Sequence, residues 1–152
     1  SDLDATETQM KEALREVNLL DFVEKSGGLD FVLLEKASNL SGGQKQRLSL
    51  ARALLHDTPI YIFDEATSNV DVESENDIMA VVRKLAKTKT VLLISHRLAN
   101  VVSADQIYVL KDGMIVEKGQ HEALCKEDGY YHRLFRQQSA LEQFGKGAVA
   151  NE

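Results

Sequence analysis

Cysteine and long apolar runs are the two clearest deficits of this sequence. Cys125 is the only cysteine among 152 residues, which excludes an internal disulfide and a cysteine metal cluster. The most apolar run, 91–94, is only strand-sized, whereas a helix that crosses a bilayer needs about 20 consecutive apolar residues. Residues 1–9 are acidic and polar, unlike a secretory signal peptide. These deficits predict a soluble chain in the cytoplasm, alone or on the cytoplasmic side of a larger assembly.

The sequence also has no excess of basic over acidic residues. The chain has 18 lysines and arginines against 24 aspartates and glutamates, a formal net charge of −6. A nucleic-acid surface needs a basic footprint that neutralises phosphates, so we expect no nucleic-acid partner. The composition that is present, 43% apolar and 28% charged, is that of an ordinary globular domain with a core of its own.

Helical and strand patterns alternate along the chain. Apolar residues at helical spacing, with Asp4 or Thr6 as the first cap, predict helices at about 4–17, 19–25, 41–58, 72–86, 120–126 and 130–143. Short apolar or alternating runs predict strands at 60–63, 90–95, 106–110 and 114–118.

This order of elements predicts an α/β fold. The strands at 60–63 and 90–95 flank one helix, so we expect a βαβ unit with parallel strands that are fully buried. Lys111, Asp112 and Gly113 predict the turn of an antiparallel hairpin. We predict a helical part at 1–58, a sheet-containing part at 59–144 and a flexible tail at 145–152.

The first segment whose residues could bind a ligand is the start of the predicted helix at 41–58. Ser41 and Gln44 have the spacing of a capping box, and Gly42 and Gly43 leave the first-turn N–H groups uncovered by side chains. Such groups, together with the positive end of the helix dipole, bind anions. The alternative is an ordinary capped helix start.

Two adjacent acids, Asp64 and Glu65, end the strand predicted at 60–63. They lie at the carboxyl end of a parallel strand, which is where α/β sheets bind ligands. Alternating side-chain directions would let one acid reach a metal ion while the other faces a water molecule. The alternative is a strand that runs out into a polar loop.

His96 follows the second parallel strand at the same edge of the sheet, so its imidazole is also a candidate ligand-contacting group. The other three histidines, His56, His121 and His132, show no metal-ligand spacing, and we expect structural roles for them. A serine hydrolase triad through His96 is disfavoured because no nucleophile-elbow pattern surrounds a serine.

In order and spacing these segments closely resemble the ATP-binding-cassette (ABC) ATPases. Residues 40–44 read L-S-G-G-Q, the family's signature motif, and 61–65 resemble its Walker B motif. Ser68 to Asp71 resembles its D-loop with the aspartate retained, and His96 matches its switch histidine. The resemblance covers nearly the whole chain.

The resemblance implies an ATP-binding domain with a partial P-loop NTPase core. ATP is bound with Mg²⁺ between two such domains that face each other head to tail. Asp64 would bind Mg²⁺ through water, Glu65 would polarise the attacking water, and His96 would hold the γ-phosphate. Ser41 to Gln44 would contact the opposite nucleotide.

An exporter is the subtype that the resemblance favours. Residues 34–37 stand where exporters carry a G-E-R-G loop that meets the membrane domain, and they retain Glu35 and Lys36. Residues 119–124 and 128–131 are similar to the closing helices of exporter domains. The implied partners are a second nucleotide-binding domain and a transmembrane permease domain, at the cytoplasmic face of the cell membrane.

The phosphate-binding Walker A pattern G-x-x-x-x-G-K-[ST] does not occur in the sequence; Gly145 and Lys146 are its nearest approach. The chain therefore resembles the C-terminal portion of the domain. We expect the isolated chain neither to bind ATP tightly nor to hydrolyse it. We also expect it to self-associate through an unpaired apolar edge beside residues 60–63.

Two alternative functions lie in other classes. One is a non-transport ABC ATPase of the DNA-repair or translation type, which the acidic composition disfavours. The other is a degenerate cassette with a regulatory role, which the retained Glu65, His96 and signature residues disfavour.

Overall fold

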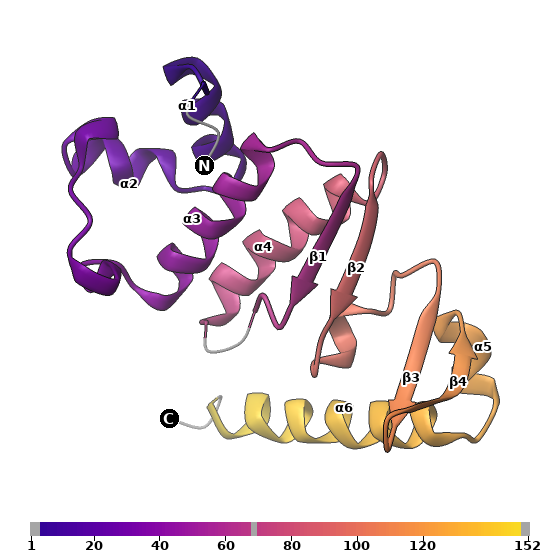
Figure 1. Cartoon of the computed structure of the whole chain (residues 1–152). Helices are drawn as coiled ribbons and strands as arrows, with labels where there is room; N and C mark the ends of the chain where they lie inside the picture. The colour runs from indigo at the N-terminus through magenta and orange to yellow at the C-terminus, as the bar shows by residue number, and fades with distance from the viewer. Residues whose placement is uncertain (1–3, 68–69, 150–152) are drawn as a thin grey trace. The chain divides into compact units, whose positions relative to one another are not determined.

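The computed structural model describes residues 4–67 and 70–149, and the side chains of these residues up to Glu142. The chain divides into two compact units, Ser1–Ile94 and Ser95–Glu152, whose elements are labelled in Figure 1. The predicted boundary between residues 58 and 59 does not coincide with this division, and the predicted domains stay predictions. No helix within the described ranges is both long and apolar enough to span a membrane.

The first unit begins with two helices, α1 (Glu7–Glu16) and α2 (Leu20–Lys25). Thr6, and not Asp4, caps α1: its hydroxyl accepts from the Gln9 backbone N–H, and the Gln9 side chain bonds back to the Thr6 N–H. Two short 3₁₀ turns, η1 (Gly28–Asp30) and η2 (Glu35–Ala37), follow in the stretch that leads to the next helix.

The predicted βαβ unit is confirmed. Helix α3 (Gly42–Leu55) leads into strand β1 (Ile60–Asp64), helix α4 (Val72–Leu85) and strand β2 (Thr90–Ile94). The two strands are parallel, in register from the Ile60–Thr90 pair to the Asp64–Ile94 pair. Because the strands run in the same direction, β1 and β2 end at one edge of the sheet.

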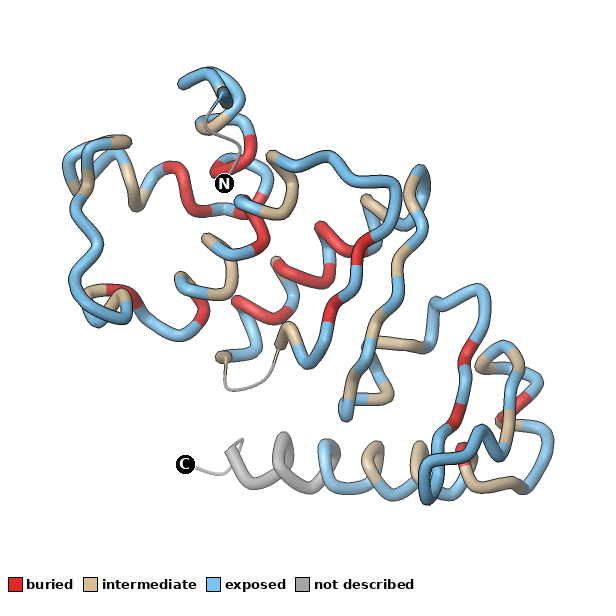
Figure 2. The backbone as a smooth tube through the Cα atoms, viewed as in Figure 1, coloured by how far each residue is buried: buried red, intermediate tan, exposed pale blue. Residues whose placement is uncertain are grey.

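Among the described residues of the first unit, side chains cover one face of this sheet and not the other, so the prediction of fully buried strands is wrong. Tyr61 and Phe63 point into a core that α1, α3 and α4 share. On the other face four apolar side chains are about half exposed or more: Ile60 (57%), Ile62 (65%), Leu92 (51%) and Ile94 (45%). The alternating burial of β1 is visible along the tube in Figure 2. A parallel sheet normally has both faces covered, so this exposed sheet face is unusual.

The second unit contains the predicted antiparallel hairpin, formed by β3 (Ile107–Lys111) and β4 (Met114–Gly119). Asp112 and Gly113 make its turn with φ of 50° and 76°, a left-handed conformation that favours Asp and Gly. Two helices follow, α5 (His121–Lys126) and α6 (Tyr130–Val149).

Helix α6 is longer than the sequence pattern indicates. The pattern ends the helix at residue 143 and predicts a flexible tail from residue 145, but the helix continues to Val149. Residues 150–152 of that tail lie outside the described residues. The first turn of α6 contributes Tyr131 to the core of the second unit, which also contains Ile107, Val109 and Leu124. Burial raises the pKa of Tyr131 to about 12, and its hydroxyl lies 2.9 Å from His121 Nδ1.

Candidate functional site

The start of α3, where the sequence predicts an anion site, is a capped helix N-terminus. Ser41 is the N-cap, and its hydroxyl accepts from the Gln44 N–H at 3.2 Å while the Gln44 side chain bonds the Ser41 N–H at 2.8 Å. The predicted capping box is therefore confirmed. Ser41 and Gly42 are exposed, and the first turn carries no acidic residue that would repel an anion. We call residues Ser41–Gln44 the signature turn.

The two glycines of the signature turn lie in different surroundings. Gly42 is exposed, but Gly43 is buried against the first turn of α4. The sequence did not indicate this burial, since both glycines fit an open turn equally well. A contact of either glycine with a nucleotide stays a prediction.

Asp64 and Glu65 lie at the carboxyl end of β1, as the sequence predicts, and both are exposed. The Glu65 N–H donates to the Ile94 carbonyl at 3.1 Å and so extends the strand ladder by one bond. Glu65 then adopts φ of 49°, which is uncommon for a residue other than glycine, asparagine or aspartate. Such backbone strain is often found at functional sites, and here it ends the alternation of side chains directly after Asp64.

Asp71, which the sequence assigns to a D-loop motif, caps α4. Its carboxylate accepts from the Ser74 N–H and from the Ser74 hydroxyl, each at 2.8 Å. These two bonds, the backbone one foremost, hold the pKa of Asp71 below its usual range. Ser68, the other D-loop residue that we predicted, lies outside the described residues. The spacing D-x-x-S is a cap signal that would have revealed the role of Ser74 from sequence.

His96 follows β2 by two residues and belongs to the second unit. The side chain of Gln138, on α6, bonds the backbone directly after the His96 side chain. The amide oxygen of Gln138 accepts from the Leu98 N–H at 2.9 Å, and its NH₂ group donates to the His96 carbonyl. Sequence reasoning missed Gln138, because a glutamine on a helix carries no signal of a partner 40 residues away.

The loop predicted to meet a membrane domain is largely exposed. Asn39 closes it by bonding the Val32 carbonyl and the Leu34 N–H, both at 3.1 Å. Val32 and Leu34 are 73% and 58% exposed, just before the predicted Glu35 and Lys36. Ala37 has φ of 50°, a left-handed conformation where the family pattern carries glycine.

The described side chains offer few ligands to a metal ion at the end of β1. Among the side chains that the structure describes, no three or more His, Cys, Asp and Glu residues form a group suited to a metal. Mg²⁺ commonly binds through one or two carboxylates plus waters and substrate phosphates. A single exposed carboxylate at the end of a strand, that of Asp64, fits this mode of binding.

Comparisons with known proteins point in one direction. A family model described as ABC transporter matches residues 3–68. A Haemophilus influenzae protein described as an uncharacterized ABC transporter ATP-binding protein is 52% identical over 148 residues, which are 97% of this chain and 26% of that protein. The Vibrio cholerae ATP-dependent lipid A-core flippase is 47% identical over 132 residues, 86% of this chain and 23% of the flippase.

A solved structure is similar as well. It is a bacterial Atm1-family ABC exporter with ATP bound, 35% identical, with a TM-score of 0.81 over 89% of this chain and 24% of that chain. This chain thus spans about a quarter of the length of the relatives that it matches.

Proposed function

We propose that this chain is a portion of an ABC transporter ATP-binding protein of exporter type, and that it supplies the signature and Walker B portion of an ATPase that drives export. The observation that carries the proposal is the pairing, within one unit, of an exposed capped turn at Ser41–Gln44 with two exposed acids at the end of β1. The reaction is Mg²⁺-dependent hydrolysis of ATP at a head-to-tail interface between two ATP-binding domains.

Each residue has one task in this reaction. Glu65 accepts a proton from the attacking water as general base, and Asp64 would hold Mg²⁺ through water. His96 donates a hydrogen bond to the γ-phosphate, in a loop that Gln138 braces. Mg²⁺, when bound, neutralises charge on the phosphates. The signature turn directs its N–H groups at the nucleotide of the opposite domain.

The proposed partner besides the second ATP-binding domain is a transmembrane permease domain at the cytoplasmic face of the membrane. The exposed apolar residues Val32 and Leu34, next to the Glu35–Lys36 pair, form a surface suited to a helix of such a domain. Relatives named as a lipid A-core flippase and as an Atm1-family exporter share this portion of the chain. We therefore propose the common ATPase role and no particular cargo.

The isolated 152-residue chain should not hydrolyse ATP, whereas the full-length protein that carries it should do so with Mg²⁺. The reason is that the 152 residues contain no Walker A pattern, whose N–H groups and lysine hold the phosphates. Phosphate release by both purified proteins, with Mg²⁺ and with a chelator, tests the proposed function. Hydrolysis by the isolated chain that Glu65→Gln abolishes would contradict the first expectation, and an inactive full-length protein would contradict the function.

The isolated chain should self-associate. The sequence attributes this association to an unpaired edge beside residues 60–63. The structure adds an exposed apolar sheet face whose burial between two copies is favourable, formed by Ile60, Ile62, Leu92 and Ile94. Sedimentation velocity over a range of concentrations should show a dimer or larger species, and Ile62→Glu should shift the chain to monomer. Val72→Glu, at an equally exposed position of 65% on α4, is the matched control and should leave association unchanged. A monomeric wild-type chain at high concentration would refute this expectation.

A further inference from the structure

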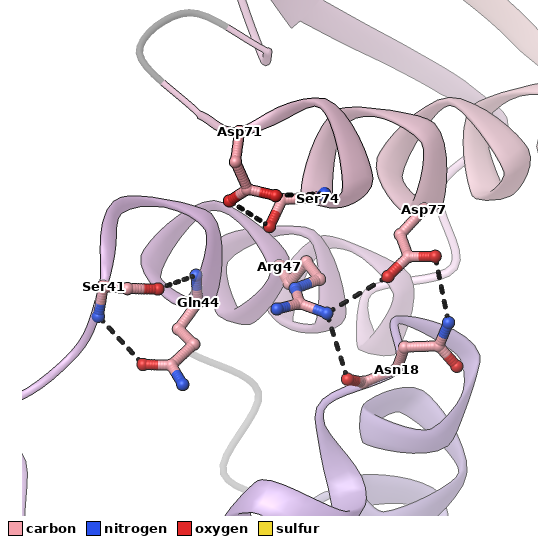
Figure 3. A network of polar contacts seen from close by, with 7 residues as sticks. All are labelled: Asn18, Ser41, Gln44, Arg47, Asp71, Ser74 and Asp77. Carbon is pink, nitrogen blue, oxygen red and sulfur yellow. Dashed lines mark hydrogen bonds and ion pairs between the residues drawn. The ribbon is translucent and has the colours of Figure 1, made fainter. Parts of the chain in front are cut away.

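The starts of α3 and α4 approach each other more closely than side chains normally allow. A Cβ atom added at Gly43 would lie 2.2 Å from Ser74 Oγ and 2.7 Å from Ser74 Cβ. No carbon atom tolerates either distance, so only glycine fits at this position. The contact brings the signature turn beside the first turn of α4, as the close view in Figure 3 shows.

Ser74 cannot turn away from this contact. It is 5% exposed, and Asp71 holds it twice, through its N–H and through its hydroxyl, each at 2.8 Å. A rotation about χ1 would move Oγ but not Cβ, whose position the backbone of α4 fixes. The obstruction at Gly43 is therefore set by how the two helices pack.

A second contact one turn further along both helices fixes the same arrangement. Arg47 on α3 donates to Asp77 on α4 and to the Asn18 carbonyl, both at 3.2 Å. The Asn18 amide in turn donates to the other Asp77 oxygen at 3.1 Å (Figure 3). Gly43 and Arg47 are four residues apart, and Ser74 and Asp77 are three apart, so each pair lies on one helix face.

We propose that Ser74 is a positioning residue for the signature turn. Position 43 is a glycine because a side chain there would collide with Ser74, and not because a nucleotide needs the space. Resting on the proposed function, the proposal assigns different tasks to the two glycines. Gly42 is exposed and remains open to the nucleotide, while Gly43 sets the distance from the turn to Asp71. The signature turn and the D-loop aspartate then move as one body.

Melting of the isolated chain tests the packing without any nucleotide. Gly43→Ala should lower Tm by about 5 °C, although Gly→Ala within a helix otherwise stabilises. Ser74→Gly removes both obstructing atoms, so the double variant Gly43→Ala/Ser74→Gly should melt no lower than Ser74→Gly alone. All variants are compared at equal protein concentration.

Ser74→Ala is the matched control, because it removes Oγ but leaves Cβ at 2.7 Å. It should therefore fail to rescue Gly43→Ala. Additive losses in the double variant with Ser74→Gly would overturn the proposal, as would a raised Tm of Gly43→Ala. If Gly43→Ala does not fold, the proposal requires Ser74→Gly to restore a folded chain, and a double variant that also stays unfolded overturns it.

ATP hydrolysis by the full-length protein separates the two explanations of Gly43. Gly43→Ala should raise the KM for ATP, and adding Ser74→Gly should return that KM to within about threefold of wild type. A double variant whose Tm recovers while its KM stays raised would mean that the nucleotide requires the glycine, which overturns the proposal. A full-length protein without any ATPase activity would refute the proposed function alone, since the melting experiment still decides the packing.

Discussion

Glu65→Gln should lower the rate of ATP hydrolysis by the full-length protein about 10³-fold, the loss expected on removing a general base. The amide has nearly the shape of the carboxylate but cannot accept the proton of the attacking water. The side chain is exposed at the end of β1, so the substitution should leave the fold and its stability unchanged. Steady-state phosphate release, with kcat and KM determined separately, measures the effect.

The KM for ATP should change little, because Glu65 acts on the water and not on the nucleotide. Glu12→Gln, an exposed substitution of the same kind on α1, is the matched control and should keep wild-type kcat. If the kcat of Glu65→Gln stays within about tenfold of wild type, Glu65 is not the general base, and the proposed mechanism is wrong.

Two inactive variants should restore activity to each other when mixed. Ser41→Arg places a long cation in the exposed signature turn and should abolish hydrolysis, as Glu65→Gln does. If each nucleotide is held by Glu65 of one chain and Ser41 of the other, a mixed dimer has one doubly altered site and one intact site. Equal amounts of the two chains, co-expressed, should then recover about a quarter of wild-type activity when the sites work independently.

Loss of the helix cap is the competing explanation for the Ser41→Arg effect, since capping contributes about 1 kcal/mol. Ser41→Ala loses the same cap without the added cation, and should retain more activity than Ser41→Arg. Mixed dimers can be isolated through two different affinity tags. If they show no activity, Glu65 and Ser41 of the same chain serve one nucleotide, which refutes the head-to-tail arrangement.

The sequence predicted best those features that depend on neighbouring residues. The predicted capping box at Ser41 involves a partner three residues away and is present. For the first helix the pattern left Asp4 and Thr6 open, and Thr6 forms the box. The parallel pair of strands followed from one intervening helix, and the hairpin from its Asp112–Gly113 turn. In these cases the structure that the local sequence favours is also the one that the tertiary fold contains.

Features that depend on distant residues were missed. Burial of both faces of β1 was expected from composition, but nothing in residues 60–63 reports what covers each face. The burial of Gly43 depends on Ser74, which is 31 positions away in the chain and on another helix. The left-handed backbone of Glu65 is equally invisible, because glutamate has no preference for that conformation.

The hydrogen bonds of Gln138 to the backbone beside His96 have an entropic consequence. A histidine in a loose loop would lose backbone freedom on meeting a phosphate, about 1–2 kcal/mol for each residue that becomes ordered. Here Gln138, on the helix that spans Tyr130–Val149, already bonds two backbone groups after the imidazole, the His96 carbonyl and the Leu98 N–H. If His96 contacts a phosphate as we propose, this part of the backbone ordering would precede binding and would lower its entropic cost.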